Sequence, residues 1–309
     1  MLMKRFLLIV AMILSVSAFA EKGLTFDLGT EPEENGNVSY GMIQYGWTDD
    51  IASRVDIRYS TKNETCDDIA GYANATESDK SNTFEADVLP LVKYFGAENQ
   101  FSLSAGASYQ FSHEKTFAGM FDVNGYMLDE GDEGKYFTME NSRTTHIVAP
   151  RVGFTATIPF AKYFKFGFES FVHPIYCLSM KQDMAYHSDQ TATAFDYSGD
   201  NSYFKVSSPY IDAKATLDVF EYVRLMSRFS FQRLEFQQMD WADDWNSLEG
   251  KDDTQTITTF RAGLELLSRK GNKARVKGGI YRQLEWNKST YRDNTESESK
   301  WVISFGTEM

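Results

Sequence analysis

The 309-residue chain has only two cysteines, Cys66 and Cys177, and only six prolines. Two cysteines cannot build the disulfide framework that stabilises small secreted domains. Beyond the first twenty residues there is no apolar run of about 18 residues, so no candidate transmembrane helix follows, and the chain is either soluble or a β-barrel. Basic residues are scarce as well: 31 Lys and Arg stand against 44 Asp and Glu, which argues against binding to nucleic acid.

The N-terminal stretch has the composition of an export signal. Lys4 and Arg5 precede an apolar run, and residues 18–20 read AFA, a small-x-small cleavage pattern. The apolar run is too short to cross a membrane as a helix. We therefore expect 1–20 to be a signal peptide and 21–309 to be one exported domain.

The chain is rich in aromatic residues, at 15%. In parts of it, apolar and polar residues alternate strictly. Residues 100–112 read QFSLSAGASYQFS, with an apolar side chain at every second position and a small or polar one between. Successive side chains of a strand lie on opposite faces. This segment therefore predicts a strand with one apolar and one polar face.

Twelve strand-like segments follow one another without a helical stretch between them. Their predicted ranges are 23–30, 37–48, 51–60, 84–94, 100–112, 143–160, 164–180, 202–219, 222–237, 254–268, 273–289 and 297–308. The connections alternate between short turns and long loops, and the main long loops are 61–83, 113–142, 181–201 and 238–253. Every long loop therefore falls at the same end of the predicted sheet.

This rhythm is typical of membrane barrels, which combine short periplasmic turns, long outer loops and an even number of strands. A soluble sandwich also alternates strands and turns, but it has no reason to place every long loop at one end. The proposed lipid-facing positions of 164–180 carry no charge: Phe164, Phe166, Phe168, Val172 and Tyr176. We predict an all-β fold, a single closed antiparallel transmembrane β-barrel of about twelve strands.

Two details depart from the pattern. Segment 37–48 has no single apolar phase, which predicts a β-bulge. Arg282 falls in the lipid-facing phase of its strand, which requires either a place near the outer interface or a different register.

On these features the chain resembles Gram-negative-type outer-membrane β-barrel proteins over the whole of 21–309. The resemblance rests on the signal peptide, the hairpin rhythm and the two-residue period, and it names no subfamily. It implies a place in the cell outer membrane, contact with outer-membrane lipid and insertion by the barrel-assembly machinery. The last strand reads KWVISFGTEM and ends in Met309, where such proteins often end in an aromatic residue.

The polar phase of the strands carries the charged residues that we expect to line the lumen. The candidates are Arg54, Arg58, Arg151, Lys165, Glu169, Asp212, Lys214, Arg224, Arg228, Arg261 and Glu265. Rings of charged side chains can select the solute that passes a pore. The alternative is a set of cross-strand ion pairs that fill a narrow lumen. A barrel of this size is compatible with both.

The predicted outer loops are strongly acidic. The densest clusters are LDEGDEG at 128–134 and DWADDW at 240–245, with the candidates Asp129, Glu130, Asp132, Glu133, Asp240, Asp243 and Asp244. They predict a vestibule that attracts cations. Neither cluster has the ligand spacing of a Ca²⁺ loop, and solvated loops are the alternative. We expect no metal site and no cofactor.

Cys66 and Cys177 both fall near the predicted outer end, so a disulfide between them is a candidate, with two free thiols as the alternative. The four histidines accompany neither a G-x-S-x-G nor an H-E-x-x-H motif, so no catalytic residue and no enzyme is expected. We expect a porin-like channel for small solutes with a cation bias. The alternatives are a surface structural or adhesive barrel with a filled lumen and, less favoured by the residues, an outer-membrane hydrolase.

Overall fold

The computed structural model describes residues 24–33, 35–67, 75–121, 136–188, 195–205, 210–220, 222–236, 253–268, 275–289 and 294–308. Within these ranges no helix has the length and apolar character needed to cross a bilayer. The predicted signal peptide at 1–20 lies outside the described residues and stays a prediction.

Nearly all of the described residues are in strands. The strands are β1 (Leu24–Glu33), β2 (Gly36–Thr48), β3 (Ile51–Asp67), β4 (Ala75–Phe95), β5 (Phe101–Phe121), β6 (Tyr136–Ala161), β7 (Phe164–His173), β8 (Tyr176–Ser188), β9 (Phe195–Lys205), β10 (Tyr210–Val219), β11 (Val223–Phe236), β12 (Asp253–Leu267), β13 (Arg275–Ser289) and β14 (Asn294–Glu308). A single short 3₁₀ turn, η2 (Ala97–Asn99), lies between β4 and β5 in this described part.

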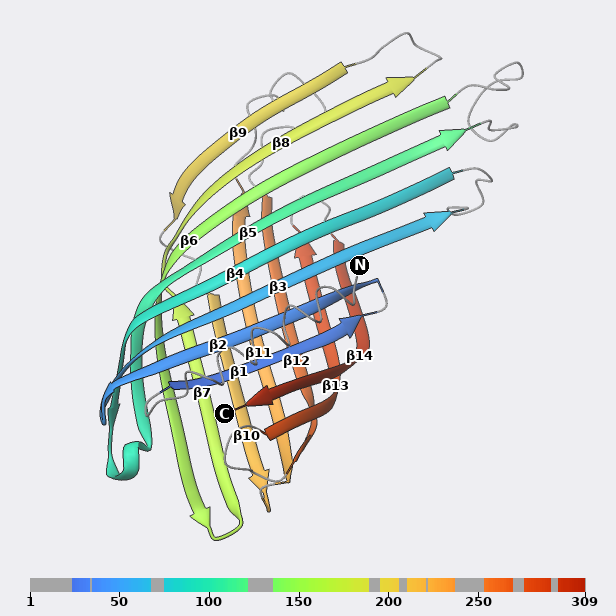
Figure 1. The fold of residues 1–309 in the computed structure, drawn as a ribbon. Helices are drawn as coiled ribbons and strands as arrows, with labels where there is room; N and C mark the ends of the chain where they lie inside the picture. Colours follow the sequence, from blue (N-terminus) through green and yellow to red (C-terminus); the bar gives the residue numbers. More distant parts are fainter. Residues whose placement is uncertain are drawn as a thin grey trace.

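Twelve of these strands close into an antiparallel barrel (Figure 1). The ring runs from β1 to β7, continues with β10 to β14, and closes where β14 pairs with β1. β8 and β9 lie outside the ring, β8 on the outer part of β6 and β9 on β8. Among the described residues, the predicted all-β class, the closed antiparallel barrel and its twelve strands are confirmed.

The predicted strand 164–180 is in fact two strands. Pro174 lacks a backbone N–H and cannot donate to a β-ladder, so β7 ends at His173. β7 pairs with β10, whereas β8 pairs with β6 and begins at Tyr176. The break shifts the phase: Tyr176 is only 4% exposed and faces inward, while Cys177 is exposed. The predicted lipid-facing place of Tyr176 is therefore wrong.

Several strands are longer than predicted. β4 and β5 have 21 residues each and β6 has 26, so parts of the predicted loops 61–83 and 113–142 belong to strands. Figure 1 shows β3 to β6, β8 and β9 rising side by side as a tall sheet. Backbone ladder bonds need no apolar side chains, so these polar segments extend the sheet beyond the lipid-facing zone.

The outer surface of the barrel carries a belt of exposed apolar side chains. It includes Ile43, Ile57, Val88, Leu91, Leu103, Val148, Val152, Phe166, Leu225, Phe229, Phe260, Leu266, Ile280 and Ile303. Aromatic residues flank the short turns, among them Trp47, Phe95, Phe160, Tyr163, Phe220 and Tyr222. A second girdle, at the other edge of the belt, comprises Tyr59, Phe84, Tyr109 and Phe111. An apolar belt between two aromatic girdles is the lipid-facing surface of a transmembrane barrel.

Both irregular positions of the sequence have a structural cause. The β2–β3 register shifts between Gly46 and Thr48, which confirms the expected bulge. Arg282 faces outward, as its phase predicts, and its guanidinium carbon lies 5.3 Å from the centre of the Trp301 ring. The aromatic face stabilises the cation, so the register of this strand needs no correction.

The closing pair of strands has the shortest ladder in the ring. β1 joins β14 through four residue pairs, from Asp27↔Glu308 to Thr30↔Phe305. β1 joins β2 through ten. The seam between the first and last strands is therefore closed by few backbone bonds.

The charged lumen as candidate functional site

A cavity of about 250 Å³ lies inside the barrel. Nine of the predicted lumen residues line it: Arg54, Arg58, Arg151, Glu169, Asp212, Lys214, Arg228, Arg261 and Glu265. Arg224 does not line it but forms ion pairs near the periplasmic end, and Lys165 is exposed there. The strand alternation thus places these side chains inside, while their role in permeation stays a prediction.

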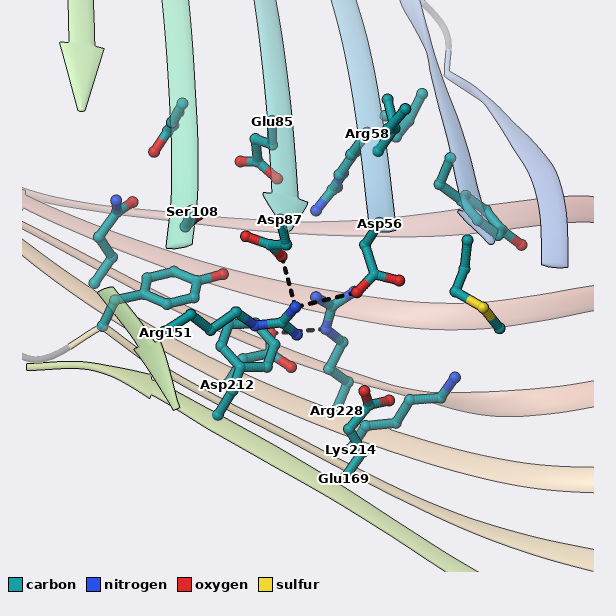
Figure 2. A pocket seen from close by; sticks show the side chains of 18 of the residues that line it. Asp56, Arg58, Glu85, Asp87, Ser108, Arg151, Glu169, Asp212, Lys214 and Arg228 are labelled. Carbon is teal, nitrogen blue, oxygen red and sulfur yellow. Dashed lines mark hydrogen bonds and ion pairs between the residues drawn. The ribbon is translucent and has the colours of Figure 1, made fainter. Parts of the chain in front are cut away.

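Arg151 of β6 projects into the cavity and lies among several acidic side chains (Figure 2). Its guanidinium pairs with Asp56 of β3 at 3.1 Å and with Asp87 of β4 at 3.0 Å. The guanidinium carbon also lies 3.9 Å from the centre of the Phe171 ring. The Arg151 side chain is only 4% exposed, so this cation is held by two carboxylates and one aromatic face.

A second ion pair spans the lumen beside it. Arg54 of β3 pairs with Glu169 of β7 at 3.0 Å and with Asp56 at 2.8 Å. Neither β6 nor β7 neighbours β3 in the ring, so these contacts cross the interior rather than follow the wall. They narrow the interior of the barrel at this level.

A third group of ion pairs crosses the seam. Arg261 of β12 binds Glu31 of β1 at 2.7 Å, and Lys277 of β13 binds Asp27 of β1 at 2.5 Å. Lys300 of β14 binds Glu33 at 3.2 Å. These pairs tie β1 to three strands on the far side of its short ladder.

A fourth group lies toward the periplasmic end. Arg224 binds Asp218 at 2.6 Å and Glu308 at 3.1 Å, and it reaches Glu265 at 3.4 Å. Glu308 also accepts a bond from Arg275 at 2.6 Å. The end of the last strand is therefore held inside the barrel by two arginines.

Not every charge that faces the cavity is neutralised. Arg58, Glu85 and Lys214 line it, and none of them forms an ion pair with a described residue. Two basic groups and one acidic group on the cavity wall are thus without a close ion-pair partner in the described part of the chain.

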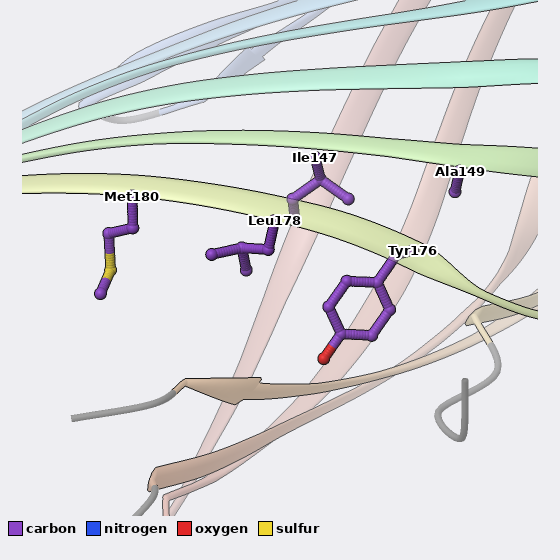
Figure 3. Packing of buried hydrophobic residues seen from close by; sticks show 5 residues of the cluster. All are labelled: Ile147, Ala149, Tyr176, Leu178 and Met180. Atoms are coloured by element: carbon purple, nitrogen blue, oxygen red, sulfur yellow. The ribbon is translucent and has the colours of Figure 1, made fainter. Parts of the chain in front are cut away.

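The side of the lumen nearest Pro174 is apolar and aromatic. The His173 ring stacks on Tyr210 with ring centroids 4.9 Å apart, and it lies beside Phe171 at 5.6 Å. Above them lies an apolar cluster, shown in Figure 3, which consists of Ile147, Ala149, Tyr176, Leu178 and Met180. Leu234 of β11 packs against this cluster.

At the periplasmic end, Asp50 lies in the turn between β2 and β3. It forms an ion pair with Lys93 and accepts a hydrogen bond from the Thr48 hydroxyl at 2.7 Å. These two donors hold the pKa of the Asp50 carboxyl below its usual range, so the Asp50–Lys93 ion pair of this turn persists to lower pH than a free aspartate would stay ionised.

The predicted disulfide is at odds with the structure. Cys177 is a free, exposed thiol on β8, whereas Cys66 lies on β3, paired with Glu77 of β4. Four strand spacings separate β3 from β8 along the wall, or roughly 19 Å, whereas a disulfide needs Cα atoms within about 7 Å. The Pro174 break also turns Cys177 outward.

The acidic clusters of the outer loops lie outside the described residues, so the cation-attracting vestibule stays a prediction. In the part of the chain that the structure describes, no group of three or more His, Cys, Asp or Glu side chains is arranged to hold a metal ion.

Sequence reasoning missed two parts of the site. Glu31, Asp218 and Glu308 were not among the lumen candidates, although each shares the inward phase of its strand. The apolar cluster was missed because it depends on the phase change at Pro174. A proline within an otherwise regular strand was the signal that could have indicated it.

No protein-family model matches the chain, and no curated protein matches it by sequence. Among solved structures, the translocator domain of the autotransporter NalP from Neisseria meningitidis is 13% identical, with a TM-score of 0.42 over 93% of this chain and 88% of that one. The beta domain of the Bordetella autotransporter Brka is 8% identical, with a TM-score of 0.30 over 93% and 98%. OprD from Pseudomonas aeruginosa is 12% identical, with a TM-score of 0.26 over 93% and 94%.

These likenesses are too weak to say what the chain does. Its own features are decisive for its class: a closed antiparallel ring, an apolar belt with two aromatic girdles, and a charged interior. The chain is an outer-membrane β-barrel, and it resides in the cell outer membrane.

Proposed function

We propose that the protein is a porin-like channel for small solutes. The observation that carries the proposal is the cavity of about 250 Å³ lined by charged side chains within the closed barrel. A charged, hydrated interior suits small polar solutes, and rings of charge govern which of them pass. The proposal includes insertion by the barrel-assembly machinery and contains no catalytic step.

The cavity itself is nearly balanced in charge. The ion pairs of Arg151 and Arg54 neutralise most of its central acids and bases. The cation preference that we propose therefore comes from the acidic outer loops, which act through a general electrostatic field rather than a specific site.

Planar-bilayer conductance of the refolded protein tests the proposal. Discrete channel openings with a preference for K⁺ over Cl⁻ are the expected result. Openings without that preference would overturn the cation bias alone, whereas a correctly folded protein that never conducts would overturn the channel itself.

A second candidate is a barrel with a filled lumen that acts through its outer surface. The ion pairs that cross the interior favour it, since Arg54 reaches Glu169 on a strand that does not neighbour its own. The same conductance experiment separates the two candidates, because a filled barrel does not conduct.

A further inference from the structure

The strands that form the barrel wall differ above and below Pro174. Below this level β10 lies between β7 and β11, with His173↔Tyr210 and Ile211↔Phe231 among the last pairs. Above it, in the described residues, β9 pairs only with β8, and residues 232–236 of β11 pair only with β12. The described residues of β9 and β11 therefore share no β-ladder in the outer part of the wall.

This interruption lies at the level of the outer aromatic girdle. Cys177 at the start of β8 is paired with Val148, and Val148 is paired with Tyr109 of the girdle. On the other side, Phe231 is paired with Thr258, which is paired with Trp286. Aromatic girdles mark the level of the lipid headgroups, so the unladdered part of the wall meets the outer interface of the membrane.

Side chains close the wall where the ladder is missing. The backbone N–H of Glu235 on β11 donates to the Tyr176 hydroxyl on β8 at 3.0 Å. Leu234 packs against the apolar cluster, whose members Tyr176 and Leu178 are 4% and 1% exposed. In Figure 3 the cluster side chains point to the same side of β6 and β8.

A part of the wall that is closed by side chains opens more easily than two strands joined by a β-ladder. Separating two laddered strands breaks a row of backbone hydrogen bonds at once. Separating β8 from β11 requires the loss of side-chain packing and of side-chain bonds such as the one from Glu235 to Tyr176, but of no ladder between the described residues of these two strands. Among the described residues, the wall is therefore easier to open here than along a laddered pair of strands, at a place that faces both the lumen and the lipid interface.

We propose that this place is a lateral portal through which amphipathic anions pass between the outer lipid interface and the lumen. The apolar cluster provides a surface for the apolar part of such a molecule. The basic groups Arg58 and Lys214 lie on the cavity wall and have no ion-pair partner among the described residues; they outnumber Glu85, the one cavity acid in the same condition. The pairing Arg58↔Glu85↔Gln110↔Ile147 places Arg58 at the register level of the cluster.

The portal goes beyond the proposed channel function and does not depend on it. An axial pore carries small polar solutes from end to end, whereas the portal serves molecules with an apolar part. Two solutes of different character therefore separate the two ideas.

The experiment locks the portal in the folded protein. In a Cys66→Ala, Cys177→Ala background, Leu178→Cys and Leu234→Cys are joined by a short, reducible bis-thiol cross-linker after refolding into lipid vesicles. The matched control carries Ala213→Cys and Phe229→Cys, an adjacent pair in the existing β10–β11 ladder. Entry of radiolabelled octanesulfonate and of radiolabelled arabinose is measured before cross-linking, after it, and after reduction.

We expect the portal cross-link to abolish octanesulfonate entry, leave arabinose entry unchanged and be reversed by reduction, while the control cross-link changes neither. Octanesulfonate entry that survives the cross-link, or a loss of both solutes together, overturns the portal. Octanesulfonate entry that the cross-link blocks in a protein impermeable to arabinose supports the portal and overturns the axial channel. A protein that admits neither solute before cross-linking overturns both.

Discussion

The Arg54 guanidinium and the Glu169 carboxylate lie 3.0 Å apart, although β4, β5 and β6 separate their strands in the barrel wall. The contact crosses the interior of the barrel instead of following its wall. Asp56 joins it to Arg151, so three strands are tied together at one level of the lumen. The width of any path along the axis depends on this group.

Removal of the Arg54–Glu169 ion pair should widen the path along the barrel axis. We expect the double variant Arg54→Gln, Glu169→Gln to have a larger single-channel conductance than the parent, because a neutral pair attracts less strongly and moves aside more readily. Lys165→Gln is the matched control, since Lys165 lies on the same strand as Glu169 but is exposed and does not line the cavity. An unchanged conductance in the double variant would place the constriction elsewhere.

A charge on the lipid-facing belt should block assembly. Phe166 faces outward, whereas its neighbour Lys165 lies in the inward phase, so Phe166→Arg places a cation in the lipid-facing belt. A cation there costs about 2–4 kcal/mol at the midplane and less toward the interface. The yield of folded barrel, measured by its resistance to cold SDS, should fall for Phe166→Arg and stay at the parental level for Lys165→Ser. Equal yields for both variants would show that the register of β7 is wrong.

Neutralisation of an outer acidic cluster should weaken the cation preference. We expect Asp129→Asn, Glu130→Gln, Asp132→Asn and Glu133→Gln together to lower the ratio of K⁺ to Cl⁻ permeability. The preference of the parent should also decline with salt, because the Debye length shortens from about 10 Å at 0.1 M to about 3 Å at 1 M. An anion-selective parent channel would instead assign selectivity to the basic groups of the lumen.

The seam ion pairs should contribute measurably to stability. Glu31 is only 7% exposed and is bound by Arg261, so Glu31→Gln should lower the free energy of unfolding by about 1–3 kcal/mol. The control is Glu64→Gln, since the Lys62–Glu64 pair is exposed and should contribute about 0–1 kcal/mol. Urea titration in detergent micelles measures both, and an equal loss for the two variants would refute the role of the seam pair.

Cys177 should react as a free thiol. Its side chain is exposed and lies too far along the wall from Cys66 for a disulfide. Treatment of the non-reduced protein with a maleimide, followed by proteolysis and mass spectrometry, should find Cys177 alkylated. A peptide that contains Cys66 and Cys177 joined by a bond would contradict the β3–β8 separation.

The sequence predicts the barrel well because the two-residue period and the position of the turns are local properties. The inward phase of Arg54, Arg151 and Glu169 follows directly from that alternation. Their pairing does not, because it depends on the curvature that brings β3 opposite β6 and β7. The phase of Tyr176 was wrong for a different reason, since Pro174 ends one strand and starts another with a different partner. Parts of the predicted loop 113–142 belong to strands. The sequence did not indicate this, because strands that extend beyond the lipid have no continuous apolar face.

The short seam between β1 and β14 has a consequence for how the molecule is made. Only four residue pairs guide the pairing of the last strand with the first. By contrast, Asp27, Glu31 and Glu33 on β1 each have a cationic partner on a later strand. Attraction between opposite charges acts over a longer distance than a backbone hydrogen bond. We therefore expect charge to draw the two ends of the sheet together before hydrogen bonds join them. On this view, closure of the ring should depend more strongly on ionic strength than the pairing of neighbouring strands in the rest of the sheet does.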